Sequence, residues 1–330
     1  MYFNFKEISA NENELLKIHG RTLFEDKICF SWSNSGVELN FEGRQIEFNF
    51  EEYVSEQPVY VKAYSEKGEQ RFGLLGAMPK VILEFDNENK HTVKLLRISE
   101  GNVPLVLQSI KIMGEAPVFL PPPPQKKLRL EFLGDSITAG YGVLASENQD
   151  KYYTCEQDST KAYAYMTAEL LDAEIRTEAQ SGQGVYRNCA GAEGNQFKRI
   201  FDMVIREKDG YDHSEWIPDV MILHCGTNDV PGGTDEETMY KEAGVLIDKV
   251  RAVYPNAKII WMYGMMNDKF HDTFKKLISD KNREGDADLY YFPVEKISRA
   301  KNEFGAAWHP NVNASQKVSV QLAKFLETVL

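Results

Sequence analysis

A run of four consecutive prolines, Pro121–Pro124, limits the possible folds of this 330-residue chain more than any other feature. Proline has no backbone N–H and a fixed φ, so four in a row enter neither a helix nor a central strand. They form a stiff, extended connector instead. The run therefore predicts two domains, residues 1–120 and 126–330, joined by a linker over residues 121–125.

The segment before the prolines has the period of β-strands. Apolar and polar residues alternate over 37–41 and again over 46–50, as in strands with one buried face. The intervening residues 42–45 contain a glycine and favour a hairpin turn, so we expect these two strands to pair. Further strand-like runs cover 59–64, 80–85, 91–98 and 105–113. Many short strands with almost no helical period predict a β-sandwich, similar to a jelly roll.

Beyond the prolines, strand-like and helical segments alternate. The expected strands cover 128–133, 173–179, 219–226, 257–264 and 288–294. The expected helices cover 160–171, with a Ser/Thr cap at its start, 235–254, a stretch between the last two strands, and the C-terminal segment. This alternation predicts a three-layer α/β/α domain with a parallel sheet. Ligands of such sheets bind beyond the carboxyl ends of the strands.

Composition excludes some partners. The formal net charge of −12 opposes binding to nucleic acid or to an anionic membrane, and it is compatible with a neutral or cationic small ligand. The first twenty residues lack the basic start and apolar core of a signal peptide, so we expect a cytoplasmic protein. The four cysteines are too far apart to form a zinc or redox pair, and the six histidines form no metal-binding motif. We therefore expect reduced thiols, no cofactor and no catalytic metal.

A candidate nucleophile follows the first strand of the second domain. The strand ends in Gly134-Asp135-Ser136, which places a serine at the edge of the sheet where active sites collect. Taken alone, a serine after Gly-Asp is better explained as a helix cap. The segment also differs from the nucleophile elbow of α/β-hydrolases, because Thr138 stands where that motif has glycine.

Three other segments complete a possible site for acyl transfer. The glycine loop 181–185 brings a backbone N–H of Gly182, or of Gly184, close to a ligand. Asn228 follows the strand 219–226 and can donate its amide to an oxyanion. His309 precedes the last helix and can take the proton of a serine. Each segment alone has a plain structural explanation as a turn, a cap or a surface histidine, but together they supply every group that the chemistry requires.

These four segments resemble those of the SGNH (GDSL-type) hydrolases, a superfamily named for its Ser, Gly, Asn and His blocks. The matching residues are Ser136 in GDSIT, Gly182 in SGQG, Asn228 in GTND and His309 in WHPN. The strand-rich first domain, with the segment 30–43, further resembles the β-sandwich of carbohydrate esterase family 2. The resemblance implies removal of acetyl groups from sugars without a metal, and an oxyanion hole made by Ser136, Gly182 and Asn228.

One departure from the superfamily pattern concerns the histidine. Most SGNH enzymes place an aspartate three residues before it, where this chain has Ala306. The family 2 resemblance suggests that a backbone carbonyl orients His309, which gives a Ser-His dyad. A distant carboxylate such as Asp268 is the rival acceptor. Trp308 is expected to form a wall of the sugar subsite, with packing beneath the last helix as the alternative.

The leading function is therefore a carbohydrate acetylesterase that acts on acetylated mono- or oligosaccharides, such as fragments of plant xylan or mannan. One alternative is a lipid esterase or thioesterase, which would need a long apolar cleft. The aromatic residues near the motifs, Tyr141, Tyr186 and Trp308, are better suited to stacking on a sugar. The other alternative is a sugar-binding protein that has lost its activity, but the presence of all four blocks argues against it.

Overall fold

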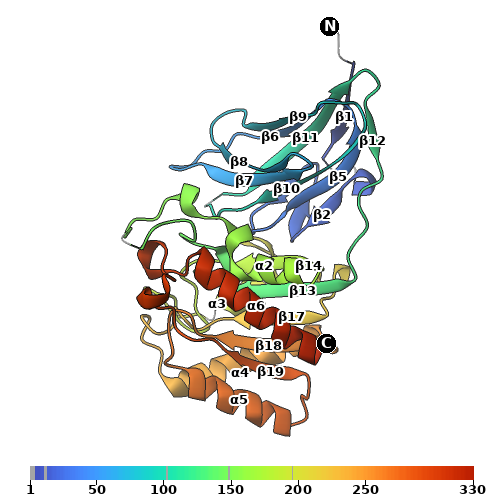
Figure 1. Cartoon of the computed structure of the whole chain (residues 1–330). Helices are drawn as coiled ribbons and strands as arrows, with labels where there is room; N and C mark the ends of the chain where they lie inside the picture. The colour runs from blue at the N-terminus through green and yellow to red at the C-terminus, as the bar shows by residue number, and fades with distance from the viewer. Residues whose placement is uncertain (1–3, 11–12, 102, 148, 195) are drawn as a thin grey trace. The chain divides into compact units, whose positions relative to one another are not determined.

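The computed structural model describes residues 4–10, 13–101, 103–147, 149–194 and 196–330. The chain divides into two compact units, residues 1–125 and 126–330 (Figure 1). The prolines 121–124 lie at the end of the first unit and belong to no helix or strand. Two hydrogen bonds fasten them to that unit, from Asn40 Nδ2 to the Pro121 carbonyl (2.7 Å) and from Lys17 Nζ to the Pro124 carbonyl (3.0 Å).

The first unit consists of two antiparallel sheets. One sheet contains β3 (Thr22–Phe24), β4 (Ile28–Phe30), β11 (Leu105–Gly114), β6 (Gln45–Phe50) and β9 (Lys80–Glu84), with β1 (Asn4–Ser9) beside β11. The other contains β12 (Val118–Leu120), β5 (Gly36–Glu42), β10 (Lys90–Arg97), β7 (Val59–Ser65) and β8 (Gly68–Leu74), with β2 (Lys17–His19) beside β5. Apolar residues of both sheets, such as Leu39, Phe48 and Ile110, form one buried core between them. The predicted sandwich is therefore confirmed.

The pairing of two predicted strands is wrong. β5 and β6 form as expected, but β5 pairs with β10, β12 and β2, whereas β6 pairs with β11 and β9 in the opposite sheet. Residues 42–45 therefore form a corner between sheets, held by a hydrogen bond from the Arg44 N–H to the Met113 carbonyl (2.8 Å). Alternation predicts that each strand buries one face. It does not distinguish two paired strands from two strands that face each other across a core.

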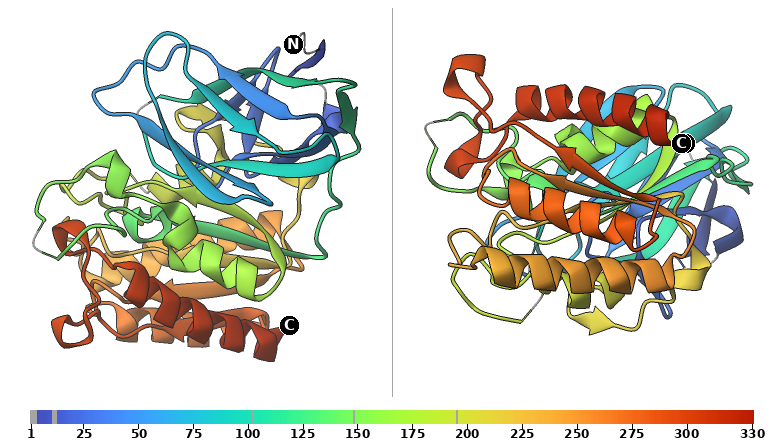
Figure 2. Two further views of the ribbon diagram at one scale, coloured as in Figure 1. Left: turned by 45° about the horizontal axis from the view of Figure 1, so that its top comes forward. Right: turned by 90° about the horizontal axis from the view of Figure 1, so that it is seen from below.

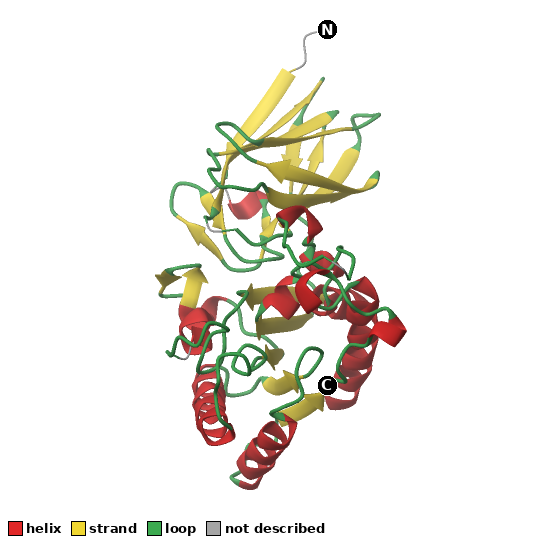
Figure 3. Cartoon of the chain, turned by 90° about the vertical axis from the view of Figure 1, so that its left-hand side faces the viewer, coloured by secondary structure: helices red, strands yellow, loops and turns green. Residues whose placement is uncertain are grey.

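The second unit has a five-stranded parallel sheet between helices, as predicted. The strand order is β14 (Ala173–Ala179), β13 (Leu128–Gly134), β17 (Val220–His224), β18 (Lys258–Tyr263) and β19 (Leu289–Pro293). The helices are α1 (Ser136–Ala139), α2 (Tyr163–Leu170), α3 (Gln196–Asp202), α4 (Glu236–Val253), α5 (His271–Arg283) and α6 (Val312–Val329). Figure 2 shows α2 and α6 over one face of the sheet and α4 and α5 over the other. In Figure 3, all helices are red and the strands are yellow.

Helix α2 differs from its prediction at the N-terminus. The expected Ser/Thr cap is absent, because α2 begins at Tyr163 after Ala162, whose side chain makes no cap hydrogen bond. The preceding residues Ser159–Lys161 form a separate 3-10 turn, which the Asp158 side chain caps. None of the helices in the described ranges combines the length and hydropathy of a membrane-spanning segment.

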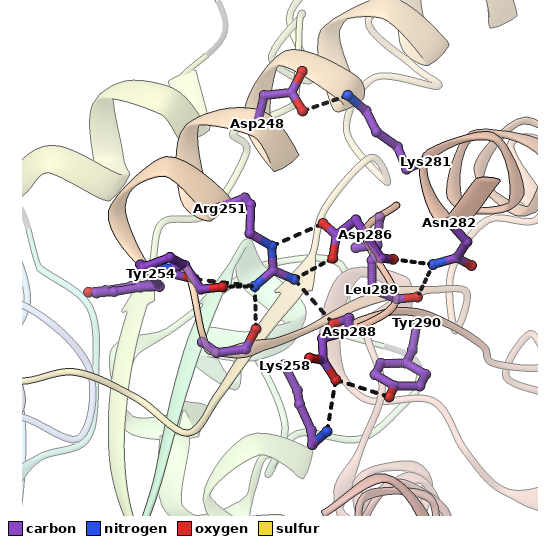
Figure 4. A network of polar contacts seen from close by, with 12 residues as sticks. Asp248, Arg251, Tyr254, Lys258, Lys281, Asn282, Asp286, Asp288, Leu289 and Tyr290 are labelled. Carbon is purple, nitrogen blue, oxygen red and sulfur yellow. Dashed lines mark hydrogen bonds and ion pairs between the residues drawn. The ribbon is translucent and has the colours of Figure 1, made fainter. Parts of the chain in front are cut away.

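A charged network links the end of α4 to the amino ends of β18 and β19 (Figure 4). Arg251, near the end of α4, donates two hydrogen bonds to the Asp286 carboxylate (3.0 and 2.9 Å) and one to the Asp288 carbonyl (3.3 Å). Lys258, the first residue of β18, donates to the Asp288 carboxylate (2.9 Å). The planar guanidinium suits this forked contact. Since Ser136 follows the carboxyl end of β13, the network lies at the opposite end of the sheet from the candidate nucleophile.

Candidate active site

Ser136 is the first residue of the one-turn helix α1, directly beyond the end of β13. Asp135 is the helix cap, and its Oδ1 accepts a hydrogen bond from the Ile137 N–H (2.9 Å). The alternative interpretation of Ser136 as the cap is therefore wrong, because Asp135 takes that role. Gly134 has a packing role, because a Cβ at that position would lie 2.1 Å from Thr138 Oγ1.

The structure brings His309 onto Ser136. The imidazole Nε2 lies 2.8 Å from Ser136 Oγ, within hydrogen-bond distance, although 173 residues separate them in the sequence. The other ring nitrogen, Nδ1, lies 2.9 Å from the Ala307 carbonyl oxygen. A hydrogen bond to that carbonyl puts the proton on Nδ1 and leaves Nε2 able to accept the proton of Ser136. The prediction that a main-chain carbonyl orients His309 is confirmed.

An unusual backbone conformation places that carbonyl. Ala307 and Trp308 both have left-handed backbones, with φ of 47° and 65°, which non-glycine residues rarely adopt. The loop is fixed from both sides, since the Ala306 N–H donates to the Gly142 carbonyl (3.1 Å) and the Gly305 N–H to the His309 carbonyl (2.7 Å). The predicted rival, Asp268, pairs with Lys296 (3.5 Å) and has a side chain that is 64% exposed.

The proposed oxyanion donors lie on three segments around Ser136. Within the described ranges, neither the Ser136 N–H nor the Gly182 N–H has a protein acceptor. The Gly184 N–H, by contrast, donates to Gln196 Oε1 (3.2 Å). Asn228 Nδ2 lies 2.8 Å from the Gln183 carbonyl and 3.3 Å from Asp135 Oδ2. This geometry favours Gly182 over Gly184, and the roles of all three donors stay predictions.

Asp229, next to Asn228, holds the glycine loop in place. Its buried carboxylate accepts the backbone N–H groups of residues 185, 186 and 187 at 2.6, 2.8 and 2.9 Å. Gly184 makes this approach possible, because a Cβ there would lie 2.6 Å from Asp229 Oδ2. Burial raises the pKa of Asp229, and the three N–H donors oppose that shift. The sequence motif places an aspartate here but does not indicate its partners.

A buried chain of polar groups lies behind the nucleophile helix. The Tyr163 hydroxyl lies 2.9 Å from Thr138 Oγ1 and 3.0 Å from His224 Nδ1. Burial lowers the pKa of His224 to about 4, and a hydrogen bond to the Gly264 backbone offsets part of the shift. Burial also raises the pKa of Tyr163 well above its usual value. Both groups are therefore neutral near pH 7 and tie β17, α2 and the GDSIT turn together.

Trp308 is 57% exposed, so it does not pack beneath the last helix. The Arg299 guanidinium lies 4.9 Å from the Trp308 ring centroid, and Phe304 contacts the same ring edge-on at 6.0 Å. An exposed indole next to His309 can offer a face to a sugar ring. Tyr141, another aromatic expected at the sugar, contacts other rings of the protein. No group of His, Cys, Asp or Glu side chains in the described ranges is arranged to hold a metal ion.

Comparison with known proteins supports this description. The cellulase/esterase CelE of Acetivibrio thermocellus is 28% identical over 321 residues, which cover 91% of this chain but only 37% of that protein. An acetylxylan esterase / glucomannan deacetylase of Cellvibrio japonicus is 24% identical over 97% of this chain and 93% of its own length. This chain therefore spans well under half of the first relative and nearly all of the second.

Solved structures give the same match. A family two carbohydrate esterase from Clostridium thermocellum, solved in complex with cellohexaose, has a TM-score of 0.88 at 25% identity and covers 95% of this chain and 98% of that one. The acetyl xylan esterase Est2A of Butyrivibrio proteoclasticus has the same TM-score at 22% identity, with 98% of each chain covered. Residues 18–123 match the N-terminal domain of carbohydrate esterase 2, and residues 132–317 match the GDSL-like lipase/acylhydrolase family. The chain belongs to this GDSL-like family of serine esterases and carries the carbohydrate esterase 2 N-terminal domain before the catalytic one.

Proposed function

We propose that this protein is a carbohydrate esterase that removes O-acetyl groups from sugars or from fragments of plant polysaccharides. The observation that carries the proposal is the hydrogen-bonded line from Ser136 Oγ through the His309 ring to the Ala307 carbonyl. A hydroxyl with a base at Nε2 and an acceptor at Nδ1 is the arrangement needed to attack an ester.

The reaction follows from these positions. Ser136 Oγ attacks the acetyl carbonyl carbon while His309 Nε2 takes the hydroxyl proton. The carbonyl oxygen becomes an oxyanion, for which we propose the N–H groups of Ser136 and Gly182 and the Asn228 amide as donors. The bond between carbon and the sugar oxygen then breaks, and the sugar oxygen receives the proton from His309. Water, activated in turn by His309, releases acetate from the acetyl-serine.

Two features of the chain favour a sugar as the alcohol part of the ester. Trp308 is exposed beside His309 and offers an aromatic face. A relative named as an acetylxylan esterase / glucomannan deacetylase aligns with 97% of this chain. We further propose a cytoplasmic location, in which case the substrates would be acetylated mono- or oligosaccharides rather than insoluble polymers.

Acetate release is the direct test. The purified protein should liberate acetate from acetylated xylo- and manno-oligosaccharides, and it should hydrolyse 4-nitrophenyl acetate far faster than 4-nitrophenyl octanoate. A preference for the octanoate would favour a lipid esterase instead. Binding of the oligosaccharides with no release of acetate, by a protein that also leaves 4-nitrophenyl acetate intact, would identify a sugar-binding protein and refute the proposal.

A further inference from the structure

Two tyrosines line up against the ring of the proposed base. Tyr141 stacks on Tyr152, with ring centroids 4.0 Å apart and planes at 17°. The His309 ring also contacts Tyr141, at 4.5 Å and 36°. At this separation the imidazole must lie over the face of Tyr141, because an edge-to-edge contact would keep the two centres farther apart. Since Tyr152 already covers one face, His309 lies against the other.

The position of the two tyrosines is tied to the nucleophile helix. The Tyr152 hydroxyl donates to Gln157 Oε1, and Gln157 Nε2 donates to the Ala139 carbonyl at the end of α1 (2.8 Å). Gln157 is completely buried. The Tyr141 N–H donates to the Ser136 carbonyl (3.0 Å). The nucleophile and the ring that faces its base are therefore held by one connected set of contacts.

The Tyr141 ring can stabilise the positive charge that forms on His309 during the reaction. When His309 takes the serine proton, its imidazole becomes a cation. In a full triad a carboxylate stabilises that cation, whereas the Ala307 carbonyl supplies only a dipole. The face of an aromatic ring is electron-rich and attracts a cation within about 6 Å of its centroid. The Tyr141 face lies within this range of His309.

We propose that Tyr141, supported by Tyr152, is a positioning residue that takes over part of the role of the aspartate that most SGNH enzymes carry where this chain has Ala306. Its ring holds the imidazole in line with Ser136 and stabilises the imidazolium that forms during attack. This inference rests on the proposed esterase function. According to this inference, Tyr141 interacts with His309 and does not stack on the sugar, because Tyr152 and His309 cover the two faces of its ring.

The test varies the electron density of the ring at constant shape. Position 141 is occupied in turn by phenylalanine and by 4-fluoro-, 3,5-difluoro- and 3,4,5-trifluorophenylalanine, each introduced into the full chain. Fluorine withdraws electrons from the ring face, so log kcat for 4-nitrophenyl acetate should fall stepwise along the series. We expect a total decrease of about 2- to 30-fold from phenylalanine to the trifluoro variant, with KM nearly unchanged.

Tyr141→Leu should lose at least as much kcat as the trifluoro variant, and Tyr141→Phe should restore most of it. The matched control is Tyr153→Leu, an exposed neighbour of Tyr152, which should retain wild-type kcat. A flat fluorination series in active protein would overturn the inference and leave the proposed function intact. Inactivity of the wild-type protein toward every acetyl ester would instead refute the proposed function itself.

Discussion

The buried His224 makes the stability of the second unit sensitive to mild acid. It is 1% exposed on β17, and its pKa is lowered to about 4 by burial. In the unfolded chain the same imidazole titrates near about 6.5. Below that pH the unfolded state therefore binds a proton that the folded state does not bind, and folding becomes less favourable.

The size of the effect follows from the difference between the two pKa values. The stability that depends on a neutral His224 is fully present above about pH 6.5. As the pH falls toward about 4, the free energy of unfolding decreases by about 1.4 kcal/mol per pH unit because of this residue. Between pH 7 and pH 4.5, His224 should therefore reduce the free energy of unfolding by about 2–3 kcal/mol. In His224→Gln no group titrates at this position, while the amide can still reach the Tyr163 hydroxyl.

The assay is urea unfolding at pH 7 and pH 4.5, followed by tryptophan fluorescence. A Trp32→Phe background leaves only tryptophans of the second unit, Trp216, Trp261 and Trp308, to report. The loss of stability between the two pH values should be smaller in His224→Gln than in the parent by about 2–3 kcal/mol. Equal losses in the two proteins would show that His224 is protonated in the folded state and would refute the reasoning.

Four further predictions follow from the same structure. Ser136→Ala should abolish hydrolysis of 4-nitrophenyl acetate without changing the circular dichroism spectrum, and substantial remaining turnover would mean that another residue attacks. Asn228→Ala should lower kcat by about 10²–10³, whereas a change in KM alone would make Asn228 a binding residue. Trp308→Ala should raise KM for acetylated oligosaccharides much more than for the aryl acetate, and equal effects would contradict a sugar subsite. Arg251→Met should destabilise the second unit by about 2 kcal/mol in urea unfolding while kcat stays unchanged, and a matching loss of kcat would show coupling between the two ends of the sheet.

Much of the fold follows from periodicity alone. The continuous apolar run at 219–226 predicts a central parallel strand, and the structure has β17 there. Periodicity could not show that residues 42–45 form a corner between sheets, because β5 and β6 bury alternate residues in the same core from opposite sheets. Which strands pair is decided by contacts that are distant in the sequence.

The site could be predicted only as a set of segments. The four blocks name Ser136, Gly182, Asn228 and His309, and the structure brings Ser136 and His309 into contact. The Asp229 contacts to the glycine loop and the stack of Tyr141 on His309 were not predictable, because each depends on backbone or ring orientation. The left-handed backbone conformation of Ala307 and Trp308 could not be predicted from the sequence either, because neither alanine nor tryptophan favours it.

The charged network at the amino ends of β18 and β19 has a consequence for engineering. Arg251 fastens α4 to the loop before β19 through backbone and carboxylate contacts, whereas Ser136 and its partners follow the carboxyl ends of the strands. This charged network and the proposed reaction are thus located at opposite ends of the same sheet. We therefore expect that substitutions around Arg251 chosen for thermostability, and substitutions in the loops around Ser136 chosen for new esters, can be made and tested independently of each other.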